Sequence, residues 1–413
     1  MTATSPGFAP RVRWAWLWSV REDVTWTLLP FWISLALGIS LLSWWQIASW
    51  GHWPVKFPEA ATQARFTGLV LYLYGPLIDA PHLWATIART YTDAAEWAER
   101  RRLFLGSLVW FFIGPLAILL PYALRAVSAY PAGYENLGWT LWSQFFTFYA
   151  LYHINKQHWG FVALYRRKNG EGAPEYKIDR AFFTTAIWLP FAAWLTAPWY
   201  LNFDGAPFPL TRIAVGGTTL GQVAHVACHV LFIVTCLAYA AFQLREWRRG
   251  MPRNGPKLVY LATVLPLYYL AFTLNPLLAA FWVLITGFGH CAQYHRIVWA
   301  YGTKKYVAPS ESDAPSLPAR IFGNVWLYVV LGVAFGLVTL QGPGGQMVST
   351  WTAGGLQRAM GTVVPFVSRT VAADVSLKAI AAFISGVRLH HFYVDSKIWR
   401  VSRSKALAKN LSV

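Results

Sequence analysis

The sequence predicts an all-α fold, a polytopic bundle of about ten transmembrane helices with both termini in the cytoplasm. Its 413 residues are 56% hydrophobic and 13% charged, with a mean hydropathy of +0.37. A soluble domain carries roughly twice this charge density. Apolar runs of about twenty residues, long enough to cross a bilayer, recur along the chain. We therefore expect one integral membrane domain over residues 1–413, with a cytoplasmic amphipathic lead at 1–25 and a basic cytoplasmic tail at 396–413.

The expected spans follow the apolar runs in order. An amphipathic lead from Val12 to Val24 is expected to lie along the membrane surface. Residues 89–102 should continue the second span as a polar helix, and residues 169–179 should form a turn. The spans are expected near Trp26–Ile47, Phe66–Ala88, Leu103–Ala123, Leu137 to His158, Ala181–Leu201, Ile213–Leu244, Leu258–Leu274, a run ending at Arg296, Ile321–Leu340 and Val375–Tyr393.

Lysine and arginine collect in alternate loops, and this sets the expected orientation. The two ends and residues 89–102, 156–180, 245–257 and 296–320 are rich in them, whereas residues 48–65, 126–136, 202–212 and 341–373 are poor. The basic loops should therefore face the cytoplasm. The net charge of +18 is explained by topology and by anionic membrane lipid, not by nucleic acid. We expect a multi-pass protein of a bacterial plasma membrane.

Histidines occur only in the even-numbered spans, apart from His52, which lies in a loop and is excluded. These spans all run the same way, so most of the rings should reach one face. A lone membrane histidine often only bonds a neighbouring helix. A shared metal ion would satisfy several imidazoles together, and imidazole suits Fe, Zn and Cu. The ligand candidates are His82, His153, His158, His225, His229, His290, His295, His390 and His391.

Two carboxylates accompany these histidines at helical spacing. Asp79 lies three residues before His82, and Asp395 lies four residues after His391, so each pair shares a helix face. A carboxylate beside a ligand ring can orient that ring by accepting its second N–H. Asp79 and Asp395 are therefore the candidate catalytic residues, acting through the ligands. Weaker candidates of the same kind are Gln157, Gln293 and Tyr393.

The histidine set resembles that of the membrane histidine-box enzymes, which include fatty-acid desaturases and sterol and alkane hydroxylases. Their pattern combines H-x3–4-H boxes with H-x2–3-H-H boxes. Here H-x4-H occurs at His153/His158 and His290/His295, H-x3-H at His225/His229, and an adjacent pair at His390/His391. No H-x2–3-H-H box occurs, so the resemblance covers the ligand set and not the whole chain.

The resemblance implies a non-haem centre, with two irons, that uses O2 to oxidise a lipid or isoprenoid-like substrate. The expected partners are this hydrophobic small molecule, O2, membrane lipid and a soluble electron donor on the basic cytoplasmic face. Two alternatives stay open. One is electron transfer by b-type haem, held by histidine pairs on two helices. The other is a proton or metal transporter lined by histidines, which would favour internal repeats, and no repeat is visible.

Overall fold

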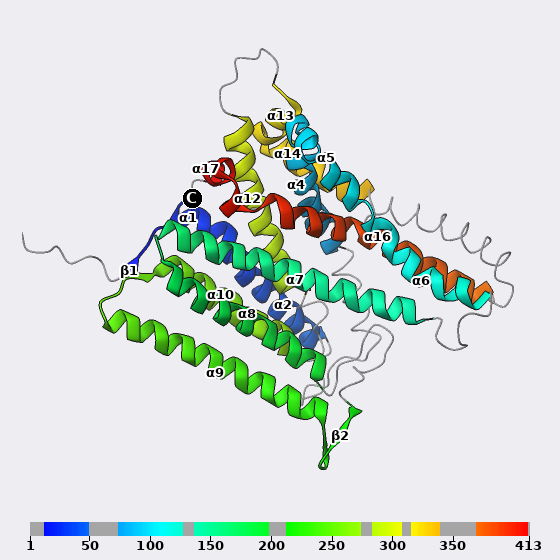
Figure 1. The fold of residues 1–413 in the computed structure, drawn as a ribbon, viewed down its shortest axis with the longest axis horizontal. Coiled ribbons are helices and arrows are strands. Elements are labelled where there is room, and N and C mark those ends of the chain that lie inside the picture. Colours follow the sequence, from blue (N-terminus) through cyan, green and yellow to red (C-terminus); the bar gives the residue numbers. More distant parts are fainter. Residues whose placement is uncertain are drawn as a thin grey trace, which may run out of the picture. The chain divides into compact units, whose positions relative to one another are not determined.

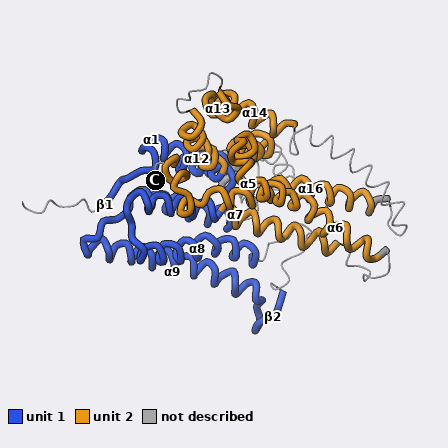
Figure 2. Tube along the Cα trace, turned by 45° about the horizontal axis from the view of Figure 1, so that its top comes forward, with its two compact units in different colours: residues 1–63, 155–290, 412–413 blue, residues 64–154, 291–411 orange. Residues whose placement is uncertain are grey.

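The structure, a computed structural model, describes residues 12–48, 73–126, 136–197, 212–273, 283–307, 315–338 and 369–411. These residues are almost entirely helical (Figure 1), and the strands β1 to β4 have two residues each. The all-α class predicted from the sequence is confirmed. The chain divides into two compact units (Figure 2). Unit 1 comprises residues 1–63, 155–290 and 412–413, and unit 2 comprises residues 64–154 and 291–411.

Unit 1 is built from long helices and two short strand pairs. Its elements are β1 (Val12–Arg13), α1 (Val20–Asp23), η1 (Val24–Leu28), α2 (Leu29–Ala48), the later part of α7 (Leu137–Lys168), α8 (Ala173–Thr196), β2 (Ala214–Val215), β3 (Thr218–Thr219), α9 (Leu220–Arg248), β4 (Arg253–Asn254), α10 (Gly255–Thr273) and η4 (Val283–Phe288). Helix α8 packs against both α9 and α10. The lead predicted over Val12–Val24 contains β1, which pairs in parallel with β4; its position along a membrane surface stays a prediction.

Unit 2 holds the remaining helices. Its elements are η2 (Gly75–Asp79), α4 (Ala80–Thr90), α5 (Ala94–Ser107), α6 (Trp110–Ala126), the earlier part of α7, α12 (Gly289–Tyr306) from Cys291 onward, α13 (Leu317–Gly323), α14 (Val325–Val338), α16 (Arg369–Ile398), η5 (Val401–Arg403) and α17 (Lys405–Leu411). Helix α16 packs along α6, and α14 packs on α4 and η2.

Each predicted span contains a helix in the part of the chain that the structure describes. Among the described residues, three helical segments are long and apolar enough to cross a bilayer: Ala94–Arg125 (α5 and α6 taken together), Leu220–Arg248 and Gly255–Thr273. The pair α13 and α14 would be a fourth if its bend of 104° lies within one span. These helices are consistent with a membrane protein. The count of ten and the cytoplasmic position of the termini stay predictions.

The sixth predicted span begins later than expected. The segment from Ile213, where the span is predicted to start, forms a hairpin with β2 antiparallel to β3. Gly216 and Gly217 turn this hairpin at φ angles of +49° and +81°, which glycine adopts without a steric penalty. Thr219 then caps α9 by accepting a hydrogen bond from the N–H of Gln222, whose side chain bonds back to Thr219.

The polar helix predicted over residues 89–102 is two helices, because Asp93 interrupts it. Its carboxylate accepts hydrogen bonds from the N–H groups of Ala95 and Glu96 and so starts α5. Burial raises the pKa of Asp93, but hydrogen bonds from Lys305 and Tyr306 outweigh burial and hold that pKa below its ordinary value. The capping carboxylate therefore stays ionised near neutral pH.

A buried ion-pair network closes the turn between α7 and α8. Lys257 and Arg166 each place a nitrogen 2.8 Å from Oδ2 of Asp179, and Lys257 also contacts Glu171 at 2.8 Å. Two cations thus balance two anions, which makes burial of this network tolerable. The turn predicted over residues 169–179 is consequently shorter, because α8 already begins at Ala173, and Asp179 lies on that helix.

Close backbone contact fixes α16 against α6. A Cβ atom at Gly386 would lie 2.6 Å from Cα of Phe111, and one at Gly114 would lie 2.8 Å from Cβ of Ala382. Ala382 and Gly386 are four residues apart, so α16 presents a small-xxx-small face to α6, a packing typical of membrane helices. This contact lies one helical turn before His390 and therefore sets the position of the histidines on α16.

We predict that Gly386→Ala destabilises the protein by about 1–3 kcal/mol, because the added methyl group overlaps the backbone of α6. The matched change Gly106→Ala on α5, where a Cβ would meet nothing within 4 Å, should be neutral or slightly stabilising. Thermal unfolding in detergent measures both. Equal midpoints for the two variants would contradict the packing argument.

Candidate metal centre

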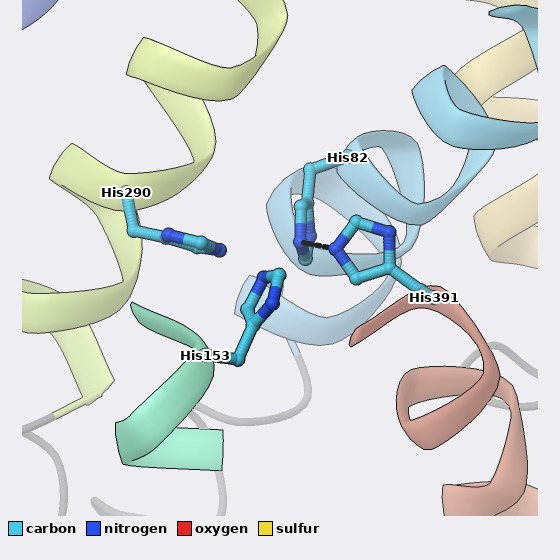
Figure 3. Close-up of side chains that lie close together, drawn as sticks. All are labelled: His82, His153, His290 and His391. Carbon is cyan, nitrogen blue, oxygen red and sulfur yellow. Dashed lines mark hydrogen bonds between the residues drawn. The ribbon is translucent and has the colours of Figure 1, made fainter. Parts of the chain in front are cut away.

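Four buried histidines from four helices bring their ring nitrogens together. They are His82 on α4, His153 on α7, His290 on α12 and His391 on α16, and one ligand atom of each lies within 4.8 Å of the others. Figure 3 shows the rings turned toward a common point. His290 is the second residue of α12, directly before Cys291.

A widened helical turn precedes two of these ligands. Before His82, the N–H of Ala80 bonds to the carbonyl of Gly75, five residues back. Pro81 has no N–H to give to the ordinary partner four residues back, which accounts for the wider turn there. A second such turn, η4, ends directly before α12. Such turns occur often at functional sites because they change the direction of the following side chains.

The proton positions on His82 follow from its surroundings. Its Nδ1 lies 2.7 Å from the backbone carbonyl of Asp79, which can only accept a hydrogen bond. Nδ1 therefore carries the proton, and in the neutral ring Nε2 carries a lone pair. The carboxylate of Asp79 contacts Arg388, at 2.6 Å from Nη2. Asp79 thus orients His82 through its backbone oxygen, while its charge is balanced by Arg388.

His391 is oriented through a short hydrogen-bond chain. Its Nδ1 lies 2.7 Å from Oγ1 of Thr86, and Thr86 donates to Oδ1 of Asp395 at 3.0 Å. Tyr294 donates to the same carboxylate oxygen at 2.7 Å. Because Thr86 gives its proton to Asp395, its oxygen accepts from His391, so Nδ1 of His391 is protonated. The lone pair of this ring is then also on Nε2.

These two assignments place two lone pairs against each other. Nε2 of His82 lies 3.0 Å from Nε2 of His391. Two neutral rings held in these tautomers would repel at this distance, so a proton or a metal ion is required between them. A single proton would bridge only His82 and His391, whereas a metal ion could contact one nitrogen of each of the four rings.

The donor set suits a transition-metal ion. Nitrogens bound at about 2.0–2.1 Å around a tetrahedral Zn²⁺ lie about 3.3 Å apart; here the four ligand atoms lie within 4.8 Å of one another, and two of them are 3.0 Å apart. Four neutral imidazoles favour Fe, Zn or Cu over Mg or Ca. The buried four-histidine group could therefore bind a metal ion. A second candidate group, Asp79, His82 and Cys291, shares His82 with the first.

Aromatic side chains enclose the centre. The ring of His153 stacks on Phe392, with ring centroids 4.3 Å apart. Tyr294 packs edge-on against both His82 and His391. These contacts shield the rings from water and limit their rotation.

Thr86 and Tyr294 are not among the site residues predicted from the sequence. A signal for them is present, because each lies four residues after a ligand histidine, Thr86 after His82 and Tyr294 after His290. Asp395 has the same relation to His391. Gln157 has it to His153, so on all four helices a polar side chain lies one turn after the ligand and on the same face.

The other five candidate ligands lie outside both groups in the described residues, and each has a hydrogen-bond partner. Tyrosine hydroxyl groups contact most of them, at 2.7–3.0 Å. The pairs are His158 with Tyr260 and Tyr268, His229 with Tyr269, His295 with Tyr328, His390 with Tyr91, and His225 with the carbonyl of Ala193 and with His229.

The three weaker candidates, Gln157, Gln293 and Tyr393, differ in their contacts and burial. Gln157 donates to the backbone carbonyl of His290 at 2.8 Å and so supports the helix that carries a ligand. Gln293 is fully buried on α12, while Tyr393 is half-buried on α16. His52 lies outside the described residues.

Comparisons with known proteins give no relative. No protein-family model matches the chain, and neither a curated protein nor a solved structure does. The fold and the histidine cluster together therefore define the class, an all-α protein with helices able to span a membrane and a buried site that could bind a metal ion.

We predict that His391→Gln abolishes metal retention and that His390→Gln does not. The two residues are neighbours on α16, but only His391 belongs to the cluster, and glutamine at position 390 can still bond to Tyr91. Elemental analysis of protein loaded with Fe²⁺ under anaerobic conditions, followed by desalting, measures this. Equal metal content in the two variants would show that the cluster is not the site.

We predict that Thr86→Val lowers metal affinity by about 10–100-fold, because it removes the acceptor that orients His391 while keeping the side-chain volume. Thr90→Val, one turn further along α4, is the control, since Thr90 bonds to the carbonyl of Thr86 and not to a ligand ring. Competition with a chelator of known affinity measures both. An unchanged affinity in Thr86→Val would contradict the assigned hydrogen-bond chain.

Proposed function

We propose that this protein is a membrane-embedded, metal-dependent oxidoreductase that uses O2 at an iron ion held by His82, His153, His290 and His391. The observation that carries the proposal is the pair of opposed Nε2 atoms, 3.0 Å apart and both orientated by donation from Nδ1. Two buried hydrogen-bond networks direct these lone pairs inward. Such an arrangement favours the binding of a cation over a purely structural role of the two histidines in helix packing.

Among the metals that imidazole favours, iron is the one that matches the proposed oxidation by O2. Iron bound by four neutral nitrogens would keep its positive charge and leave positions open for O2, which supplies the oxidising power. The protein side chains would hold the site dry and fixed. The fully buried Tyr294 and Asp395 form a hydrogen-bonded pair beside the ligands that can hold or move a proton.

The site favours one ion over two. Four histidines complete the protein's share of a single centre. The second group would rely on Asp79, whose carboxylate already pairs with Arg388 at 2.6 Å. A second iron there would have to compete with that guanidinium. The proposal is therefore a single iron, and it departs from the two irons that the histidine-box resemblance implied.

The substrate class follows from the surroundings. Unit 2 holds apolar helices, and the ligands lie among aromatic rings, so a hydrophobic molecule such as a lipid or an isoprenoid chain is the matching substrate. Electrons would come from a soluble donor at the basic cytoplasmic loops. The protein would then reside in a plasma membrane, drawing its substrate from the bilayer.

The haem alternative is less well supported. A b-type haem takes two histidines on opposite faces of a wide planar ring. Here four ligand atoms lie within 4.8 Å of one another, and two of them are in hydrogen-bond contact. The group has space for an ion, and a porphyrin would have to force these rings apart.

Binding of nitric oxide tests the proposal without knowledge of the substrate. We expect the reduced, iron-loaded protein to give the EPR signal of a high-spin iron–nitrosyl complex, because NO occupies a position open to O2. His390→Gln should keep the signal and His391→Gln should lose it. Intense haem absorption bands, exclusive retention of zinc, or an iron centre that does not react with NO would each overturn the proposal.

A further inference from the structure

A second histidine pair, in unit 1, has its own geometry. His225 and His229 lie one turn apart on α9, and their Nε2 atoms are 3.2 Å from each other. Nδ1 of His225 lies 2.8 Å from the carbonyl of Ala193 on α8, and Nδ1 of His229 lies 2.7 Å from the hydroxyl of Tyr269 on α10. Each ring is therefore anchored at one nitrogen to a different helix, and both rings direct the other nitrogen to one point.

The carbonyl of Ala193 fixes the protons in this chain. It can only accept, so His225 donates from Nδ1 and carries its lone pair on Nε2. His229 then donates from Nε2 to that lone pair, and Tyr269 donates to Nδ1 of His229. One proton lies between the two Nε2 atoms. Ala193 is in the last turn of α8, where carbonyls lack a backbone partner within the helix; its oxygen accepts from the hydroxyl of Thr196 at 3.2 Å and has a second lone pair for His225.

Replacement of that single proton by a metal ion requires little rearrangement. His229 would carry its proton on Nδ1 in place of Nε2, and the hydroxyl hydrogen of Tyr269 would rotate away so that its oxygen accepts from Nδ1. Both Nε2 atoms would then face the ion, and both Nδ1–H groups would bond to oxygen, the arrangement usual for metal-bound histidines. Both rings are half-buried, so the ion could keep water or other ligands in its remaining positions.

We propose that His225 and His229 form a separate binding site for a divalent transition-metal ion of the type that prefers imidazole, such as Cu²⁺, Ni²⁺ or Zn²⁺. Neither residue belongs to the metal-capable groups found around His82 in the described residues. The site does not depend on the proposed oxidoreductase activity. Its two ligands come from one helix, and their supports come from α8 and α10.

The ion would strengthen the attachment of α9. Most side chains of this helix are not buried; the buried residues are Gly221, Phe232, Tyr239 and Gln243. Its later part is held by Tyr239, which stacks on Phe182 and donates a hydrogen bond to Asp179. The histidine pair lies nearer the start of the helix. Metal binding there would join α9 to α8 and α10 through the two Nδ1–H groups, and a ligand that binds only the folded state raises stability.

Titration of the full-length protein in detergent with Cu²⁺ tests this site. Wild-type protein loaded with iron should bind one further equivalent of Cu²⁺, with an EPR spectrum showing coupling to two nitrogens and with a higher thermal midpoint. His225→Gln keeps a donor for the carbonyl of Ala193 but removes the imidazole. It should lose the further equivalent, and so should His229→Ala.

Three variants separate this site from the neighbouring thiol and from the four-histidine group. Cys228→Ala, at the adjacent position on α9, should bind the further equivalent as wild type does. His391→Gln should also bind it, whether or not iron is retained at the four-histidine group. Tyr269→Phe should weaken binding by about 10–100-fold, since it removes the oxygen that orients His229 without touching the ion.

The proposal is overturned if wild-type protein takes up no further Cu²⁺, or if His225→Gln and His229→Ala retain it while folding normally. It is also overturned if His391→Gln abolishes it, since the ion would then reside at the four-histidine group. Should a variant fail to fold, the nitrogen coupling in the wild-type EPR spectrum, together with the response of Tyr269→Phe, still decides the question.

Discussion

Two lone pairs that face each other inside a dry protein need a positive charge between them. This requirement links the features of unit 2. The carbonyl of Asp79 and the oxygen of Thr86 each take a proton from the outer nitrogen of a ligand ring, so the inner nitrogens are left as bases. Asp395 and Tyr294 hold Thr86 in place. In an apolar interior this arrangement of basic nitrogens would favour the binding of a cation.

Hydrophobicity and its interruptions made much of the fold predictable. Each predicted span contains a helix in its described part, and Asp79 and Asp395 lie 3.4 Å and 3.7 Å from the rings of His82 and His391. Local backbone chemistry accounts for the differences. Asp93 ends one helix by capping the next, and Gly216 and Gly217 form a hairpin where the apolar pattern suggested a longer helix. Hydropathy averages over many residues and therefore cannot detect such single-residue signals.

The site was less predictable than the fold because helical direction says which residues reach one face, not which rings meet. His390 and His391 are adjacent, yet only His391 joins the cluster, while His390 bonds to Tyr91. His158 lies between two tyrosine hydroxyls and needs no ion. Four of the nine candidate histidines meet in the cluster, and several of the others contact tyrosine hydroxyl groups instead. Tyrosines at matching depth on neighbouring helices cannot be identified without the tertiary arrangement.

The ion pair between Asp79 and Arg388 has a consequence for how the protein matures. Asp79 lies at the end of η2, one turn before His82, and Arg388 lies one turn before His391, so the pair fastens α4 to α16 beside the two facing nitrogens. The side chain of Arg388 is 26% exposed and that of Asp79 is 10% exposed, so the pair is partly shielded from water. A metal ion bound at the four histidines would therefore enter a site whose helices the folded chain already joins.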